Sequence, residues 1–215
     1  MFIEMWMTRD VVTVSPEAPI MDARETMRQH NIRRLPVMKG EKLVGIVTQG
    51  DIQEAGPSDA TSLSIWELNY LLAKTTVEEV MSREVVTVRP QDTIEEAAVK
   101  MRRHKVGGLP VVGGQEGLVG IITESDIFVV LIEVMGFEEG GTRLTIELKD
   151  EPGALVQVLE PIRDHHVNIL SLASSHLHPG PPNRREVVIR MVAQGNTEEI
   201  IWELKAADIQ IVDVR

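Results

Sequence analysis

Two Thr-x-x-Asp segments are the residues whose type and spacing best suit the binding of a polar ligand. Thr48 and Asp51 form one pair, and Thr123 and Asp126 form the other. Each pair stands where an apolar run passes into an expected helix, whose N-terminus favours an anion such as phosphate. The threonine can donate to a ligand oxygen, and the aspartate offers acceptor oxygens on the first turn. The same pattern is also explained by plain helix capping.

Two adjacent arginines add a group suited to phosphate. Arg33-Arg34 precedes one Leu-Pro-Val segment, and Gly107-Gly108 precedes the other. Arginine recognises phosphate through several planar hydrogen bonds. The sequence therefore predicts unequal clefts: one around Asp51 with a cation for phosphate, and one around Asp126 that is weaker, empty or fitted to a less charged ligand. Asp51→Ala is then expected to weaken binding more than Asp126→Ala. The alternative is that the arginines are solvated surface charges.

Catalytic chemistry finds little support. The chain has no cysteine, so thiolate nucleophiles, thiolate metal sites and disulfides are excluded. Neither a Gly-x-Ser-x-Gly elbow nor a Walker phosphate loop occurs. His176 and His178 could bind a metal, but no third ligand is evident. The sequence predicts neither an enzyme nor a metal site, and a small nucleotide hydrolase would lack a nucleophile and a poised base.

Charge and hydropathy narrow the class of partner. The net charge of −11 argues against broad binding to nucleic acid, which needs a basic face. No apolar run approaches the roughly 20 residues of a membrane-spanning helix. We therefore expect a cytoplasmic protein without a nucleic-acid or membrane partner, and small anionic ligands stay open because a local basic pocket could hold a phosphate.

An internal repeat must position the Thr-x-x-Asp segments. Residues 7–16 (MTRDVVTVSP) match residues 81–90 (MSREVVTVRP), and residues 43–51 (LVGIVTQGD) match residues 118–126 (LVGIITESD). Each copy predicts a short strand (residues 11–14 in the first), a helix, two strands and a final helix. Thr93 and Glu96 form a capping box for the first helix of the second copy. Two such copies usually pack together, because one copy cannot bury its apolar face alone.

The repeated order Thr-Val-x-Pro, Leu-Pro-Val and Gly-hydrophobic-hydrophobic-Thr-x-x-Asp resembles the CBS motif, named for cystathionine β-synthase, over about the first 135 residues. The resemblance implies a pseudo-symmetric module with two clefts for AMP, ADP, ATP or S-adenosylmethionine as regulatory ligands, without a catalytic cofactor. It also implies that Asp51 and Asp126 bind the ribose hydroxyls and that apolar strand residues contact adenine, although those residues could equally serve the core. The predicted nucleotide-binding residues are Thr13, Val14, Ile32, Arg33, Arg34, Pro36, Thr48, Asp51, Thr87, Val88, Val106, Gly107, Gly108, Pro110, Thr123 and Asp126.

The C-terminal part has a different pattern. From about Thr142, alternating and helical apolar spacing predicts a βαββαβ order, as in ferredoxin-like folds. Asp-x-Pro-Gly-x-Leu at residues 150–155 and Val-Asn-Ile at residues 167–169 resemble the ACT domain. The resemblance implies an amino acid or other small effector at a subunit interface, with Asp150, Gly153 and Asn168 as contacts. The alternative is a dimerisation module in which Gly153 only forms the turn and Asn168 only satisfies backbone.

The predicted fold class is therefore α/β (α+β), a CBS pair followed by a ferredoxin-like ACT domain. The expected boundaries are residues 1–138 for the pair (motif 1 about 1–56, linker helix 57–75, motif 2 about 76–138) and 139–215 for the ACT domain. The order of domains resembles acetoin-utilisation proteins of the AcuB type, which implies a link to acetoin or acetyl-CoA metabolism. We expect a homodimer or larger assembly that regulates an unidentified target protein. The alternatives are a nucleotide-responsive transcriptional regulator and an oligomerisation module without ligand.

Overall fold

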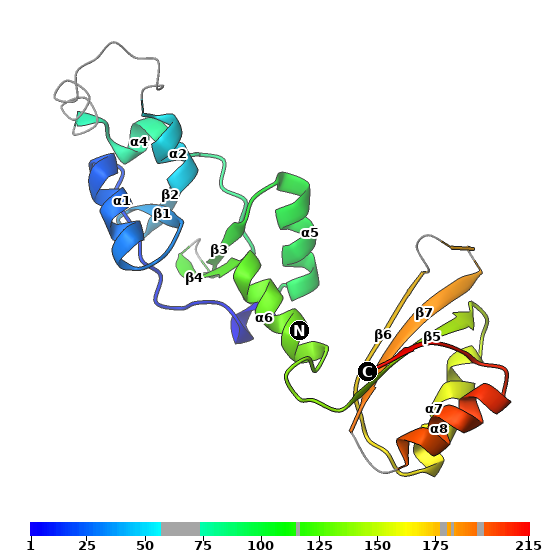
Figure 1. The fold of residues 1–215 in the computed structure, drawn as a ribbon. Coiled ribbons are helices and arrows are strands. Elements are labelled where there is room, and N and C mark those ends of the chain that lie inside the picture. The colour runs from blue at the N-terminus through cyan, green and yellow to red at the C-terminus, as the bar shows by residue number, and fades with distance from the viewer. Residues whose placement is uncertain (57–73, 115–116, 177–179, 182, 193–195) are drawn as a thin grey trace. The chain divides into compact units, whose positions relative to one another are not determined.

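A computed structural model describes residues 1–56, 74–114, 117–176, 180–181, 183–192 and 196–215. These residues form two compact units, Met1–Ile127 and Phe128–Arg215, and each is described by itself (Figure 1). Most of the linker helix expected at residues 57–75 lies outside the described residues. Within the described ranges, no helix has the length and apolar character needed to cross a membrane. The fold is the predicted mixture of helices and antiparallel sheets.

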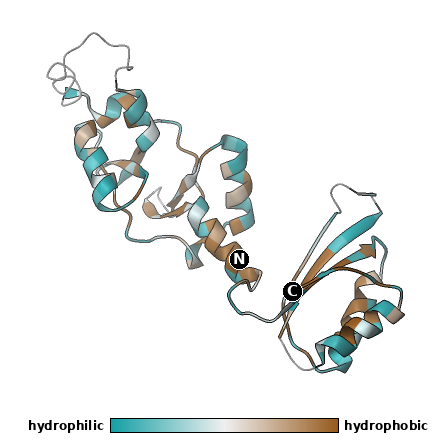
Figure 2. Cartoon of the chain, viewed as in Figure 1, coloured by the Kyte–Doolittle hydropathy of each residue, from teal (hydrophilic) through white to brown (hydrophobic). Residues whose placement is uncertain are grey.

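The first unit contains the two copies of the repeat. The elements of the first copy are α1 (Ile20–Gln29), β1 (Arg34–Lys39), β2 (Lys42–Thr48) and α2 (Gln49–Glu54), after a short 3-10 helix η1 (Ile3–Met5). Those of the second copy are α4 (Val77–Val80), α5 (Ile94–His104), β3 (Gly108–Val112), β4 (Leu118–Thr123) and α6 (Glu124–Val134), whose residues from Phe128 onward belong to the second unit. The predicted capping box of α5 is confirmed, since Thr93 and Glu96 exchange backbone-to-side-chain hydrogen bonds of 2.8 and 3.2 Å. Figure 2 shows α6 as mostly hydrophobic beyond its first turn.

The strand predicted at residues 11–14 is wrong. Only Val14 pairs, through a single parallel bridge to Val37 of β1. Its N–H donates to the Pro36 carbonyl at 3.1 Å, and its own carbonyl accepts from Met38 at 2.9 Å. Residues 11–13 have no strand partner, and β1 pairs with β2 in a two-stranded sheet. The residues ahead of Val14 are therefore free to pass to the other copy.

In each copy, the segment that precedes the first long helix, here called the lead-in segment, pairs with a strand of the other copy. Thr8 of the first copy exchanges two backbone hydrogen bonds with Ile121 of β4, at 2.9 and 3.0 Å. Ser82 of the second copy makes the same exchange with Ile46 of β2, at 2.9 and 3.0 Å. Glycine in the receiving strand allows this approach: a Cβ at Gly120 would lie 3.0 Å from the Cγ of Met7. The two copies are therefore interlocked through these lead-in segments.

The second unit is a four-stranded antiparallel sheet with two helices. Its elements are β5 (Thr142–Lys149), α7 (Ala154–Asp164), β6 (Ile169–His176), β7 (Arg184–Met191), α8 (Thr197–Ala206) and β8 (Gln210–Val214). The strand order is β6-β7-β5-β8, so β6 and β8 are the two edges. Apolar residues from β5, β7, α7 and α8 form one buried cluster. This is the predicted ferredoxin-like βαββαβ arrangement.

Candidate functional site

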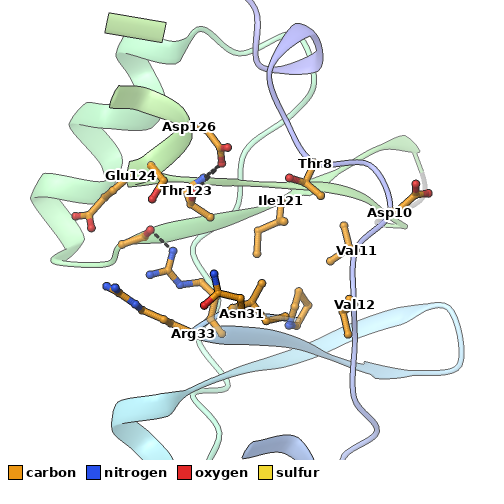
Figure 3. Close-up of a pocket in the computed structure, with 15 residues that line it drawn as sticks. Thr8, Asp10, Val11, Val12, Asn31, Arg33, Ile121, Thr123, Glu124 and Asp126 are labelled. Carbon is orange, nitrogen blue, oxygen red and sulfur yellow. Dashed lines mark hydrogen bonds between the residues drawn. The ribbon is translucent and has the colours of Figure 1, made fainter. Parts of the chain in front are cut away.

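A cavity of about 430 Å³ lies between the two copies of the repeat in the first unit (Figure 3). This volume is within the usual range of small-molecule pockets. Four parts of the chain line it: the first lead-in segment, the start of β1 with the residues just before it, Gly107 before β3, and the junction of β4 with α6. The lining residues are Thr8, Asp10, Val11, Val12, Asn31, Ile32, Arg33, Arg34, Pro36, Gly107, Ile121, Thr123, Glu124, Ser125 and Asp126.

Thr123 and Asp126 form the polar wall at the start of α6. The backbone N–H and the hydroxyl of Thr123 both donate to Oδ2 of Asp126, each at 2.7 Å. Among the described residues, Oδ1 of Asp126 accepts no hydrogen bond. The helix cap therefore uses only one of the two carboxylate oxygens of Asp126, which lines the cavity. The other oxygen is an available acceptor for a ligand hydroxyl.

Thr48 and Asp51 repeat this geometry at the start of α2. The N–H and hydroxyl of Thr48 donate to Oδ2 of Asp51 at 2.7 and 2.8 Å, and the Asp51 N–H donates back to the hydroxyl at 3.3 Å. Neither residue lines the described cavity. The two Thr-x-x-Asp caps are thus nearly identical locally, and what distinguishes them is the set of residues that faces each one.

Arg33 and Arg34 bring positive charge to the cavity. Arg34 begins β1 opposite Thr48 in the β1–β2 register, but its Nη1 donates to the Gly107 carbonyl of the other copy. Partial burial lowers the pKa of Arg34, and the negative charge of Glu124 opposes that shift. Arginine remains protonated at neutral pH despite such a shift. The exposed Arg33 side chain makes no hydrogen bond or ion pair within the described part of the chain, so it can bind an anion.

Gly107 and Gly108 provide the space for the Arg34 side chain. A Cβ on Gly107 would lie 2.7 Å from Nη2 of Arg34, and a Cβ on Gly108 would lie 2.9 Å from its Cδ. Side chains at these positions would displace the guanidinium. The second copy therefore has no arginine of its own at these positions, but the Arg34 side chain of the first copy lies against them. The two glycines accept the arginine of the first copy.

The arginines belong with Asp126 and not with Asp51. The sequence-based pairing placed Arg33 and Arg34 in the cleft of their own copy, but the cavity joins them to the Thr123–Asp126 cap of the second copy. The physical reason is the interlocking of the copies, which brings the start of β1 beside the start of α6. The unequal clefts stay a prediction, but the stronger one is now expected at Asp126.

The structure brings together part of the predicted nucleotide-binding set. Ile32, Arg33, Arg34, Pro36, Gly107, Thr123 and Asp126 line the described cavity. Thr13, Val14, Thr48, Asp51, Thr87, Val88, Val106, Gly108 and Pro110 do not. Val88 is 1% exposed and bridges Val111 in the core, and its predicted adenine contact stays a prediction. Sequence reasoning missed Thr8, Asp10, Val11, Val12, Asn31, Ile121, Glu124 and Ser125.

The three predicted effector residues of the second unit do not form one site within a chain. β5 and β6 run parallel on either side of β7, with Thr142 and Ile169 both paired to Met191. Asn168 therefore lies at the end of the sheet where β5 begins, whereas Asp150 and Gly153 follow the end of β5. Asp150 accepts from Nε of Arg185 at 2.7 Å, and Gly153 has a φ of 90° at the start of α7. A site that contains all three needs a second copy of the chain.

Potential metal ligands do not gather in the part of the chain that the structure describes, where no group of three or more His, Asp or Glu side chains is suitably placed. His178 lies outside the described residues. His165 instead contacts α8: its Nε2 is 2.8 Å from Oε1 of Glu203, and its Nδ1 is 3.5 Å from Oε2 of Glu199. This contact joins the end of α7 to α8 and is structural.

Comparison with known protein families covers nearly all of the chain. The CBS domain model matches residues 3–58 and 77–133, and the TTHA0829-like ACT domain model matches residues 140–215. The CBS domain-containing protein YhcV of Bacillus subtilis is 34% identical over 139 residues, which are 65% of this chain and 89% of YhcV. The inosine-5'-monophosphate dehydrogenase of Korarchaeum cryptofilum is 41% identical over 125 residues, 58% of this chain but only 23% of the dehydrogenase. The chain thus spans less than a third of that enzyme.

Solved structures resemble the CBS part. A crystal structure assigned to acetoin utilization (AcuB) from Vibrio cholerae is 35% identical, with a TM-score of 0.54, and covers 65% of this chain and 96% of its own. The CBS domain pair of protein MJ0100, in complex with 5'-methylthioadenosine and S-adenosyl-L-methionine, is 30% identical (TM-score 0.51; 61% and 95% covered). CBSX2 in complex with AMP is 26% identical (TM-score 0.51; 62% and 97% covered). CBS pairs of this kind are regulatory modules that bind adenosine ligands. The interlocked repeat and these matches show that the chain belongs to the CBS-domain family and carries a TTHA0829-like ACT domain after its CBS pair.

Proposed function

We propose that this chain is a non-enzymatic regulator that binds an adenosine ligand in the cavity between its two CBS motifs. The single observation that carries the proposal is the convergence of Asp126, Arg33 and Arg34 on one cavity of about 430 Å³. Such a cavity offers an acceptor for ribose hydroxyls and cations for a 5′ phosphate. The similar CBS pairs that hold AMP or S-adenosyl-L-methionine support the same class of ligand.

The position of each ligand group follows from the cavity walls. The ribose hydroxyls would donate to Oδ1 of Asp126, the oxygen that the helix cap leaves available. The 5′ phosphate would accept from Arg33 and from the N–H groups of Ser125 and Asp126 in the first turn of α6, since the N–H of Glu124 already donates to the Gly107 carbonyl at 3.1 Å. Adenine would lie against the apolar residues Val11 and Ile121, which line this cavity.

Titration calorimetry with AMP, ADP, ATP, S-adenosylmethionine and NAD tests this function. We expect saturable binding of at least one of them and no turnover of the bound compound. Binding followed by release of phosphate or adenine would favour a nucleotide hydrolase instead. Absence of a binding signal with all five compounds would favour the alternative that the CBS pair is an oligomerisation module without ligand. Retention on DNA at physiological salt would favour the transcriptional alternative.

The second unit is proposed to supply dimerisation and a second regulatory site. β6 is an edge strand without a charged residue, and antiparallel pairing with β6 of another copy would complete its hydrogen bonds. That pairing would bring Asn168 of one copy toward Asp150 and Gly153 of the other, because His176 at the far end of β6 lies 3.8 Å from Asp150. An amino acid is the proposed effector at this junction.

The cellular role is proposed at a coarser level. We place the protein in the cytoplasm, acting on a target protein in acetoin or acetyl-CoA metabolism, and the similarity to AcuB of Vibrio cholerae supports that role. The proposed domains are residues 1–138 and 139–215. The family matches, which end at residue 133 and restart at residue 140, support this boundary. Loss of growth on acetoin after deletion of the gene, restored by the wild-type chain, would test the metabolic link.

A further inference from the structure

The charged residues of the cavity are distributed unevenly. This distribution bears on the number of negative charges that a bound ligand can carry. Arg33 and Glu124 lie at one end of the cavity, and Asp10 lies at the opposite end (Figure 3). Asp126 stands on the first turn of α6. The end that would receive a 5′ group therefore contains two guanidinium groups and the N-terminus of α6, together with the Glu124 carboxylate and the more weakly acting charge of Asp126.

Glu124 lies close to the arginines without neutralising either one by direct contact. A Cβ on Gly107 would lie 2.9 Å from Oε2 of Glu124 and 2.7 Å from Nη2 of Arg34, so both charged groups lie against the same glycine. Glu124 is also the charge that most raises the pKa of Arg34. No hydrogen bond or ion pair engages the Glu124 carboxylate among the described residues. It is an exposed negative charge that lines the cavity beside Arg34.

We infer that Glu124 restricts the cavity to adenosine compounds whose 5′ group carries no more than two negative charges, so that AMP binds and ATP is rejected. This inference rests on the proposed function. A monophosphate dianion matches the charge of Arg33 and Arg34. A longer phosphate chain extends past the arginines and brings further negative charge toward Glu124. In a partly desolvated site, repulsion between like charges alters affinity by about tenfold or more.

Titration of AMP and ATP into the full chain tests this selectivity, at fixed ionic strength and with EDTA present to remove divalent cations. For the wild-type chain, we expect AMP to bind at least about tenfold more tightly than ATP. Glu124→Gln should tighten ATP binding about tenfold and change AMP binding less than threefold. Glu41→Gln is the matched control, because it removes the same charge from an exposed turn outside the cavity. It should leave the ratio of the two affinities unchanged.

Three results would overturn the inference: ATP binding as tightly as AMP in the wild-type chain, an unchanged ratio in Glu124→Gln, or an equal change in Glu41→Gln. Each of these still requires saturable binding, so the adenosine-binding function would survive. Absence of binding by both nucleotides, and by S-adenosylmethionine in a parallel titration, would instead remove the proposed function together with the selectivity. The two failures are therefore distinguishable.

Discussion

Asp126 and Asp51 have the same local role and different surroundings. Each accepts two hydrogen bonds from its threonine through Oδ2, but only Asp126 lines the cavity with the arginines. The repeat alone treats the two residues as equivalent and assigns Arg33-Arg34 to Asp51. The interlocking of the copies reverses that assignment. Residue identity thus predicts the chemistry of the site, and long-range pairing determines which residues share it.

Asp126→Ala is expected to weaken AMP binding by about tenfold or more, because hydrogen bonds to a charged acceptor contribute roughly 1.5–3 kcal/mol. Asp51→Ala is the matched control: it removes an equivalent cap and should weaken AMP binding less. Calorimetric titration of both variants measures the difference. Both should lose a similar stability of about 1 kcal/mol from the lost cap. A larger loss of affinity in Asp51→Ala would contradict the assignment of the cavity.

Gly108→Ala is expected to destabilise the first unit by about 0.5–1.5 kcal/mol, because the Arg34 side chain would move aside and lose its hydrogen bond to the Gly107 carbonyl. The new Cβ would lie 2.9 Å from Cδ of Arg34, and Gly108 itself is buried. Removal of the arginine should relieve the clash, so Arg34→Ala/Gly108→Ala should be more stable than the sum of the single changes indicates. Urea unfolding of the four proteins gives this coupling. Gly114→Ala is the control, since open space surrounds its Cβ position; additive effects in the double variant would show that Arg34 does not need the glycine.

The two edge strands of the second unit differ in their protection against pairing. β8 contains Asp213, which forms ion pairs with Arg143 at 3.1 Å and Arg215 at 3.0 Å. β6 contains no charged residue, and its Leu172 is 40% exposed. Charged edge strands resist pairing with another chain, so β6 is the favoured edge for a dimer.

Leu172→Lys on β6 is expected to shift the protein from dimer toward monomer at micromolar concentration. Val212→Lys on β8 is the matched control, because Val212 is 53% exposed on the opposite edge and should tolerate the charge. Light scattering coupled to gel filtration measures the mass of each variant. Dissociation by the β8 substitution alone would show that the dimer interface lies on β8 and not on β6. An unchanged dimer in both would assign assembly to the CBS pair.

Local patterns predicted most of the elements but few of the contacts between them. The apolar spacing of α5 and its Thr93 cap, and the alternation along β5, depend on neighbours in sequence, so they could be derived directly. Of the lead-in residues 8–12, only Thr8 pairs with a strand, and its bridge to Ile121 of β4 joins positions far apart in the chain. Thr8, Val11 and Ile121 were therefore missed as cavity residues. Similarly, the strand order of the sheet is needed to recognise that Asn168 and Asp150 lie at opposite ends of it.

At the scale of the whole molecule, the cavity links ligand binding to the stability of the first unit. Its walls come from both copies: Arg34 and Ile32 from the first, and Thr123 and Asp126 from the second. A ligand that contacts all of them binds only when the two copies are folded together. Binding to the folded state alone raises its stability by about 2.7 kcal/mol when the ligand is at a hundred times its dissociation constant.

Scanning calorimetry of the full chain should therefore show that saturating AMP raises the melting temperature of the Met1–Ile127 unit by roughly 10 °C. The shift should largely disappear in Asp126→Ala and persist in Asp51→Ala, because the second variant keeps the walls of the cavity intact. A shift that survives in Asp126→Ala would mean that AMP stabilises the chain from another place. Equal loss of the shift in both variants would mean that the two caps contribute through folding and not through contact with the ligand.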